Sequence, residues 1–355
     1  MNEIATIGLD LAKRYFPVHA ADATGQELLR RKLRRAEVEP FLAATPACLV
    51  AMEACSTVHH WARVAARHGH QVRLLPPQYV KPYVRRNKND AADAAAICEA
   101  ASRPSMRFVA VKTVEQQAAL TLHRTRALLV KQRSMLANAL HGHLGEYGIA
   151  STQGIPAMRE RAAAILIGEE AGCLPALAMQ ALKLLARQFI DLDAQVQRAE
   201  AMVLAAHKAD AASRRLASIP GIGPVTASAL VASIGDVGQF RSGRELAAWL
   251  GLTPKQNSSG GKDRLGGISK RGDAYLRRLL VNGAMTIIRH AQVAQEKPTS
   301  RIACSALGQW VRALLARRKR LPAAVALANK LARIVWAVLT RGEEFRPLGR
   351  SPMPA

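Results

Sequence analysis

Four carboxylates in the first third of the chain have the types and positions that metal-assisted phosphodiester chemistry requires. Asp10 lies inside the apolar run IGLDLAK and Glu53 ends the run LVAME, where a charge is costly unless it binds a cation or a partner. Asp90 and Asp93, in KNDAADA, are three residues apart on a predicted helix and so share one face. Two divalent ions about 3.5–4 Å apart can activate the attacking oxygen and stabilise the leaving oxygen of a phosphodiester. Because Mg²⁺ takes oxygen ligands, these four side chains are candidate Mg²⁺ ligands.

A glycine-rich basic loop holds a second group of candidates. In Gly251–Gly272 (GLTPKQNSSGGKDRLGGISKRG), Ser258 and Ser259 are followed by four nearby cations, Lys262, Arg264, Lys270 and Arg271. A serine in such a loop can hydrogen-bond a phosphate, or it can attack phosphorus while the cations stabilise the transition state. Residue chemistry alone favours the phosphate contact.

The segment Ile219–Ala227 (IPGIGPVTA) has the pattern of a helix-hairpin-helix. Its turn, with Gly221 and Gly223, would expose backbone N–H groups beside a helix N-terminus and hold a phosphate without reading sequence. A tight turn between two packed helices, or a protein contact, would give the same pattern.

The charge of the chain agrees with a polyanionic partner. Lys and Arg number 51 against 26 acidic residues, a net charge of +25, and residues 211–355 alone carry 24 basic and 7 acidic side chains. Such an excess attracts nucleic acid. Aromatic residues make up only 4% of the chain, which disfavours an extended base-stacking platform. The basic runs Arg30–Arg35 and Arg317–Arg320 are solvated faces or backbone contacts with RNA or DNA.

Other classes of protein are disfavoured. We find no apolar run of about 18 residues and no signal-peptide pattern, so we expect no membrane span and no export. The five cysteines form no CxxC pair, and their odd number argues against a disulfide framework. We therefore expect a reduced, cytoplasmic protein.

The first 110 residues have an α/β pattern that would position the acids. Short apolar stretches predict strands, and polar–apolar periodicity with N-cap residues predicts helices. The strands are expected at Ile4–Leu11, Tyr15–Ala20, Cys48–Glu53 and Gln71–Leu75, and the helices from Ser56 to His70 and over Asp90–Ala101.

The middle of the chain changes to long helices with heptad spacing. This spacing indicates a coiled coil or two ordinary core helices, joined by a turn region at Gly148–Cys173. One stripe contains Leu122, Leu129, Leu136, Leu140 and Leu144, and the second contains Leu182, Leu185, Phe189, Leu192, Val196, Ala199 and Val203.

Taken in order, these motifs resemble a known family. Acids on two strands and a helix of a small α/β domain resemble the RNase H-like (RuvC-like) nucleases. The blocks IGLDLAK, AMEAC, KNDAADA, IPGIGPVTA and LTPKQNSSGGKDRLGGISKRGD, from about Ile4 to Arg341, are similar to the DEDD insertion-sequence transposases of the IS110 family, in its IS1111 branch. The resemblance implies a RuvC-like domain at 1–112, a coiled-coil dimerisation segment at 113–210, a mainly α-helical transposase domain with a helix-hairpin-helix at 211–345, and a tail at 346–355.

The resemblance also implies a mechanism. Asp10, Glu53, Asp90 and Asp93 would hold two Mg²⁺ ions, and Ser258 or Ser259 would form a covalent link to DNA. Ser259, directly before Gly260, fits a Ser-Gly form of the motif, whereas Ser258 fits branches with Ser-Thr-Gly-Gly. Acids and serine would come from different protomers of a homodimer or homotetramer. A noncoding bridge RNA would pair with target and donor DNA, in the nucleoid of a bacterium or archaeon.

Two other functions remain open at this stage. The chain could be a metal-dependent, junction-resolving nuclease that uses water as its nucleophile. It could also be a non-catalytic nucleic-acid-binding protein whose acids are structural, because a strand-end Asp often forms a turn and a helical acidic pair is often solvated.

Overall fold

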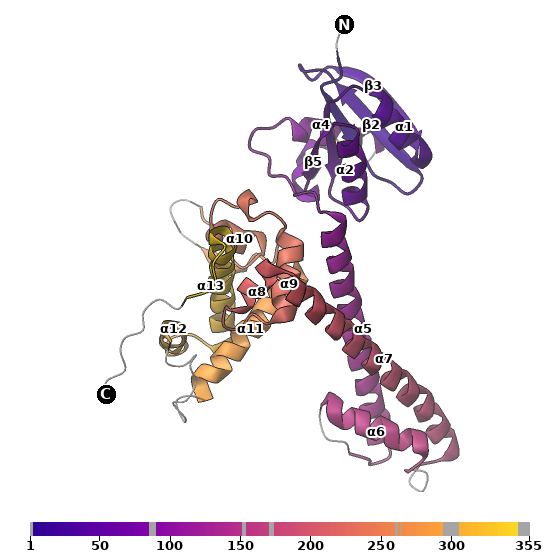
Figure 1. Ribbon diagram of the computed structural model, residues 1–355, viewed down its shortest axis with the longest axis vertical. Coiled ribbons are helices and arrows are strands. Elements are labelled where there is room, and N and C mark those ends of the chain that lie inside the picture. Colours follow the sequence, from indigo (N-terminus) through magenta and orange to yellow (C-terminus); the bar gives the residue numbers. More distant parts are fainter. Residues whose placement is uncertain are drawn as a thin grey trace. The chain divides into compact units, whose positions relative to one another are not determined.

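The computed structural model describes residues 3–84, 90–150, 154–169, 174–259, 262, 264–293 and 305–346 (Figure 1). The side chains of Asp90, Ala91 and Val293 are outside the described part. The chain forms two compact units, Met1–Val114 and Glu115–Ala355, which we call unit 1 and unit 2.

Unit 1 is built on a mixed five-stranded sheet in the order β3-β2-β1-β4-β5. Its strands are β1 (Thr6–Leu9), β2 (Tyr15–Ala21), β3 (Glu27–Arg34), β4 (Leu49–Glu53) and β5 (Gln71–Leu75). The first three strands are antiparallel, and β1, β4 and β5 are parallel. Four of the strands lie where the sequence predicts them. The edge strand β3 was not predicted, because most of it is the basic run that includes Arg30–Arg34.

Helices cover both faces of this sheet. On one face, Ile7, Leu9, Val50 and Met52 pack with Trp61 against α1 (Val38–Ala44) and α2 (Val58–Arg67). The other face packs against α4 (Asp90–Ala101), the short α3 (Pro77–Val80) and a 3-10 turn at Lys81–Tyr83. A second 3-10 turn, Arg35–Glu37, precedes α1. The mixed α/β prediction for this region is confirmed.

Unit 2 begins with three packed helices, α5 (Val114–Gly145), α6 (Ile155–Ile167) and α7 (Ala176–Ala209). The predicted turn region Gly148–Cys173 is therefore wrong, because it contains α6. The apolar residues of α6 pack with those of α5 and α7 in one cluster. The heptad spacing on either side of this segment gave no sign of a third helix. Within the predicted second stripe, the buried residues of α7 are Leu182, Phe189, Leu192, Val196, Ala199 and Val203. The stripe is the core-facing side of α7 within one chain.

The rest of unit 2 is a helical bundle with one small hairpin. Its elements are α8 (Ala211–Ala217), α9 (Pro224–Ile234), a 3-10 turn (Val237–Gln239), α10 (Gly243–Trp249), β6 (Pro254–Gln256), β7 (Leu265–Ile268), α11 (Ala274–Val293), α12 (Ala306–Leu315) and α13 (Arg320–Arg341). Among the described helices, α13 alone is long and apolar enough to cross a membrane. The search for an uninterrupted apolar run did not find it, because charged residues interrupt its sequence. One side of α13 packs into the core of the bundle.

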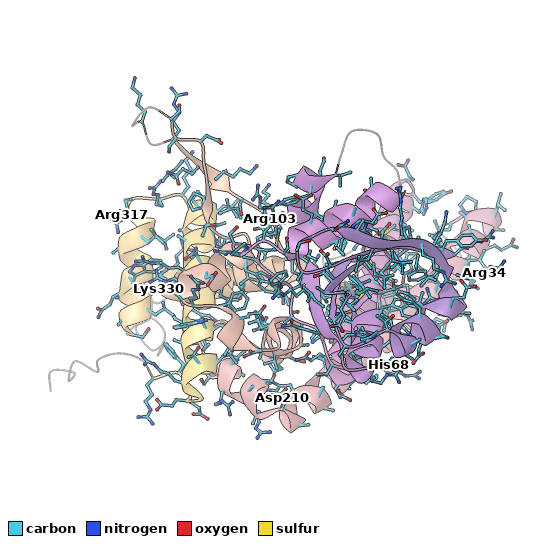
Figure 2. All side chains as sticks on the ribbon, turned by 90° about the horizontal axis from the view of Figure 1, so that it is seen from above. Arg34, His68, Arg103, Asp210, Arg317 and Lys330 are labelled. Atoms are coloured by element: carbon cyan, nitrogen blue, oxygen red, sulfur yellow. The ribbon has the colours of Figure 1, made fainter. Side chains whose placement is uncertain are left out.

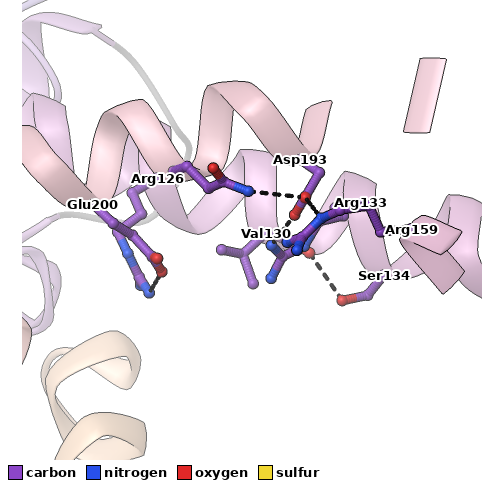
Figure 3. A network of polar contacts seen from close by, with 8 residues as sticks. Arg126, Val130, Arg133, Ser134, Arg159, Asp193 and Glu200 are labelled. Atoms are coloured by element: carbon purple, nitrogen blue, oxygen red, sulfur yellow. Dashed lines mark hydrogen bonds and ion pairs between the residues drawn. The ribbon is translucent and has the colours of Figure 1, made fainter. Parts of the chain in front are cut away.

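A buried carboxylate joins the three long helices (Figure 3). Asp193 on α7 is 2% exposed and accepts hydrogen bonds from Arg133 Nη1 on α5 and Arg159 Nε on α6, both at 2.7 Å. Burial alone would raise the pKa of Asp193, but the hydrogen bonds and charges of the two guanidinium groups hold it below its usual range. A second pair, Arg126 with Glu200, lies farther along the same helices, so α5 and α7 run antiparallel.

A buried histidine joins α5 to the bundle. His123 Nε2 lies 3.1 Å from Ser228 Oγ on α9, and its Nδ1 lies 3.3 Å from the Tyr275 hydroxyl on α11. Burial, together with the charge of Arg126, lowers the pKa of His123 to about 4. The ring is therefore neutral at neutral pH and acts as a hydrogen-bonding link between the long helices and the bundle.

Replacing the buried acid should destabilise unit 2. Asp193→Asn would leave the largely buried Arg133 and the half-exposed Arg159 without their counter-charge. Solvent around Arg159 lowers the cost below that of breaking a fully buried pair, to about 2 kcal/mol. We expect that loss in the free energy of unfolding measured by urea denaturation. Asp191→Asn, an exposed acid two residues away, is the matched control and should change stability little. Equal stability of the two variants would contradict a structural role for Asp193.

Candidate functional site

Backbone pairing places Asp10 beside Glu53. Strands β1 and β4 are parallel with Leu9 opposite Met52, and each acid is the next residue along. Side chains alternate between faces along a strand. Because Leu9 and Met52 point into the core beneath α1 and α2, Asp10 and Glu53 point to the other face, the one that packs against α4.

Helix α4 brings further acids to the same end of the sheet. Asp90 is its first residue and Asp93 lies in its first turn. The pKa of Glu53 is raised by its burial and by the negative charges of Asp10 and Asp93, so each of these two carboxylates lies close enough to Glu53 to repel it. The side chain of Asp90 is outside the described part, but it is the residue one turn before Asp93 on this helix. The structure thus brings three of the four predicted acids together.

A glycine sets how closely α4 approaches the sheet. A Cβ on Gly8 would lie 2.2 Å from the carbonyl oxygen of Ala94 and 2.9 Å from Cys98 Cβ, so only a residue without a side chain fits. Its cross-strand neighbour on β4 is the small Ala51, which is also fully buried. The contact with Ala94 fixes the start of α4, and therefore Asp93, over the ends of β1 and β4.

These acids suit a hard divalent cation. A cation would relieve the repulsion that raises the pKa of Glu53, and carboxylate oxygens are the ligands that Mg²⁺ prefers. Within the described residues, no three acidic, His or Cys side chains are close enough to form a metal site as they stand. Waters and substrate phosphate usually complete the coordination of Mg²⁺, which needs only one or two protein carboxylates.

The candidate serines lie at the tip of the β6–β7 hairpin in unit 2. Ser258 Oγ accepts hydrogen bonds from the backbone N–H of Arg264 and from Gln256 Nε2, both at 3.2 Å. Ser259 pairs with Lys262 in an isolated bridge and its side chain is exposed. Both serines are exposed, and the hairpin holds the Ser258 oxygen in one orientation.

Four predicted cations surround this hairpin, and all are exposed: Lys262, Arg264, Lys270 and Arg271. Lys270 has a positive φ of 55°, which is uncommon for a residue with a side chain. Its N–H donates to Gly251 O at 3.1 Å, and Arg277 Nη1 donates to Arg271 O at 3.1 Å. The backbone at the base of the hairpin is thus fixed, whereas the charged tips of the side chains face solvent.

The two glycines of the predicted helix-hairpin-helix have different surroundings. Gly221 has a φ of 79°, and its Cβ would lie 2.7 Å from Gly283 O on α11, so it is required for packing. Gly223 is exposed, precedes the first residue of α9 and has no atom within 4 Å of where a Cβ would lie. A phosphate could approach the start of α9 at Gly223, whereas Gly221 positions the turn. Gly221 therefore fits the alternative of a tight turn between two packed helices.

Known proteins match both halves of the chain. A DEDD model for IS110 proteins, described as a transposase, matches residues 7–149, and a model described as the transposase IS116/IS110/IS902 family matches residues 213–298. A probable family 20 transposase of Pseudomonas aeruginosa is 48% identical over 349 residues, covering 97% of this chain and 99% of that protein. The chain belongs to the IS110 family of transposases.

Other relatives in this family are named for their elements. The transposase for insertion sequence element IS1111A of Coxiella burnetii is 41% identical, over 98% of this chain and 92% of that protein. The transposase for IS1328 of Yersinia enterocolitica is also 41% identical, over 97% of this chain and 99% of that protein. The predicted family is confirmed, and with it an enzyme that transfers DNA strands.

Some residues that shape this site were not recognised from the sequence. Gly8 lies inside the quoted block IGLDLAK, and its spacing of two residues from Asp10 on a buried strand was the available signal. Gly283 in the middle of α11 gave a similar hint, because a glycine in a helix is destabilising unless something packs closely on it.

Adding one methyl group at the sheet should disturb the transposase site. Gly8→Ala would force α4 away from β1, because the new Cβ would lie 2.2 Å from a backbone oxygen. We expect a loss of about 2 kcal/mol in unfolding free energy, typical of overpacking, and a loss of DNA strand cleavage. Gly142→Ala on α5, where a Cβ would meet nothing within 4 Å, is the control and should retain both. Full activity of Gly8→Ala would show that the approach of α4 does not set the site.

Proposed function

We propose that this transposase cuts and rejoins DNA by Mg²⁺-dependent transesterification, with the acids of unit 1 and a serine of unit 2 in one active site. The observation that carries the proposal is the convergence of Asp10, Glu53 and Asp93 at one end of the sheet. Strand order and the position of α4 support an RNase H-like (RuvC-like) arrangement of unit 1.

Asp10, Glu53, Asp90 and Asp93 would hold two Mg²⁺ ions. When bound, the ions neutralise charge on the scissile phosphate and stabilise the attacking and leaving oxygens. The protein's own part is to present the carboxylates in a fixed arrangement, through the β1–β4 register and the packing at Gly8. Carboxylates already held at one end of the sheet reduce the rearrangement that is needed when the ions bind.

Of the two serines, we assign Ser258 as the nucleophile. Its oxygen is held by two N–H groups that would also stabilise negative charge as its proton leaves, whereas Ser259 has no such support among the described residues. The Ser258 Oγ–P bond would form as one bridging P–O bond of DNA breaks. The serine proton passes to solvent, and the departing DNA oxygen takes up a proton. The phosphodiester becomes a phosphoserine ester, so a second DNA hydroxyl can reverse the step and rejoin the strands.

We further propose that the complete site forms between protomers, in a homodimer or homotetramer acting on target and donor DNA in the cytoplasm. A noncoding bridge RNA would select both DNA partners by base pairing. The family resemblance supports both points, and the 24 basic against 7 acidic residues of 211–355 provide the charge that an RNA and two DNA duplexes require. Gly223, Lys262, Arg264, Lys270 and Arg271 would contact nucleic acid backbone, with Gly221 positioning the turn.

Serine and acid variants separate this mechanism from its rivals. With DNA that carries the element's ends, we expect the wild type to give an SDS-stable protein–DNA adduct that disappears in Ser258→Ala, Asp10→Asn and Glu53→Gln. Ser259→Ala is the matched control and should still form the adduct, because none of the described residues makes a hydrogen bond to the Ser259 side-chain oxygen.

Other outcomes point to other mechanisms. An adduct lost only in Ser259→Ala would move the nucleophile by one residue and leave the mechanism in place. Cleavage that survives both serine variants would identify a nuclease that uses water. Full activity of Asp10→Asn would remove the metal site altogether.

The guide RNA has a separate test. We expect that expression with the gene's native noncoding flanks yields one discrete, flank-derived RNA that stays bound through a high-salt wash and is identified by sequencing. Nonspecific phosphate binding falls steeply with salt, so RNA held by charge alone washes away. Recovery of only heterogeneous RNA that is removed by salt would contradict the guide and leave a protein that recognises DNA by itself.

A further inference from the structure

Residues directly across the sheet from Asp10 and Glu53 can be followed through β2 to the edge strand β3. The N–H of Asp10 donates to Pro17 O on β2 at 3.0 Å, so the pairing of β1 and β2 extends one residue past Leu9. Pro17 is opposite Lys32 on β3. The order across the sheet at this level is therefore Lys32, Pro17, Asp10 and Glu53. Because cross-strand neighbours share a face of the sheet, all four occupy the same face.

Core residues fix which face that is. Phe16 and Val18 on β2 and Leu33 on β3 are buried in the cluster beneath α1 and α2. Their neighbours Tyr15, Lys32 and Arg34 must point to the opposite face, which is the face of Asp10 and Glu53. Lys32 Nζ lies 5.1 Å from the centre of the Tyr15 ring, which agrees with this assignment.

An aromatic ring and two cations therefore lie together next to the acids. Tyr15 is 44% exposed, and its cross-strand partner is Arg34, whose exposed side chain lies at the margin of unit 1 (Figure 2). Among the described residues, no ion pair joins the guanidinium group of Arg34 to a carboxylate, although its backbone N–H donates to Glu37. Tyr15, Lys32 and Arg34 are all exposed, so packing in the core does not account for their presence at this position.

We propose that Tyr15, Lys32 and Arg34 form a platform for the DNA strand next to the phosphate that is cut. One unpaired base would stack on the Tyr15 ring, and backbone phosphates would pair with Lys32 and Arg34. The proposal rests on the proposed function, because it requires the scissile phosphate to lie at Asp10 and Glu53.

The spacing suits a single nucleic acid strand. Neighbouring strands of a sheet are about 4.8 Å apart, so β3 lies about 10 Å from β1. Lys32 is level with Asp10, so the phosphate that it would contact is separated from the phosphate at the acids by a short run of nucleotides. Arg34, two residues farther along β3, would contact a neighbouring phosphate. Aromatic side chains hold unpaired bases without reading their sequence, which matches a protein whose target is chosen by other means.

Charge variants on one strand test the phosphate contacts. The probe is a fluorescent single-stranded DNA of mixed sequence, and affinity is measured by anisotropy over a range of salt, with EDTA present so that no cleavage occurs. For Lys32→Gln and for Arg34→Gln we expect the plot of log affinity against log salt to become about 0.7 shallower, the value for one lost phosphate contact. Arg31→Gln is the matched control, because Arg31 is exposed on the same strand but on the opposite face, and its slope should equal that of the wild type.

Aromatic variants test the stacked base. Tyr15→Ala should weaken binding of the same probe about tenfold, and Tyr15→Phe, which keeps the ring, should bind like the wild type. Thermal unfolding of each variant checks the fold. If Tyr15→Ala is unfolded, the pair Lys32→Gln and Arg31→Gln still decides the question.

The outcomes separate this platform from the proposed function. Equal slopes for Lys32→Gln, Arg34→Gln and Arg31→Gln would overturn the platform, even while Asp10→Asn abolishes cleavage and the proposed function stands. Shallower slopes for the two platform variants, retained in the Asp10→Asn background, would support the platform as a binding surface. If Asp10→Asn cleaves normally while the slopes change, the proposed function fails and a nucleic-acid-binding surface remains.

Discussion

The close contact between Gly8 and α4 is the constraint on which the candidate metal site depends. Two like unit charges 4 Å apart near a protein surface repel by about 4 kcal/mol, so acids brought together must be held there by the rest of the fold. The β1–β4 register holds Asp10 and Glu53, and the glycine contact holds the helix that carries Asp93. The packing energy of unit 1 thereby maintains a concentration of negative charge that only a cation or a proton can relieve.

The candidate acids and the candidate serines belong to separate compact units, and on the proposed mechanism this separation has a chemical use. Acids with bound metal but no serine could activate only water, which would break DNA without rejoining it. A serine without the metal is a weak nucleophile at its ordinary pKa. Strand transfer then depends on bringing unit 1 and the β6–β7 hairpin together on DNA, so an unassembled protomer would be inert. The exposed hairpin tip and its fixed base, held through Lys270 and Arg277, suit a part that must meet a partner.

The sequence predicted the parts of the candidate site that local pattern encodes and missed the contacts between distant residues that position them. Asp10 and Glu53 were found because a charge at the end of an apolar strand is conspicuous. The contact of Gly8 with Ala94 joins residues far apart in the chain, so spacing alone could not reveal it. Helix α6 was missed because the heptads on either side suggested a simple hairpin. Asp193 was overlooked although an acid beside the buried Leu192 signals a paired charge, and its partners lie on two other helices.

Strand β3, which the sequence pattern did not predict, suggests how a polyanion could approach a group of acids. β3 needs only Leu29 and Leu33 to pack on the core, which leaves its other positions free for charge. As an edge strand it also benefits from Arg and Lys, because they prevent pairing with another sheet. Alternation then sends Lys32 and Arg34 to the side of the acids and Arg31 to the other side. The cations of β3 are the reason that its sequence does not look like a strand. On the proposed function the same side chains would offset the repulsion between DNA and Asp10, Glu53 and Asp93, so they would both protect the sheet edge and assist the approach of the substrate.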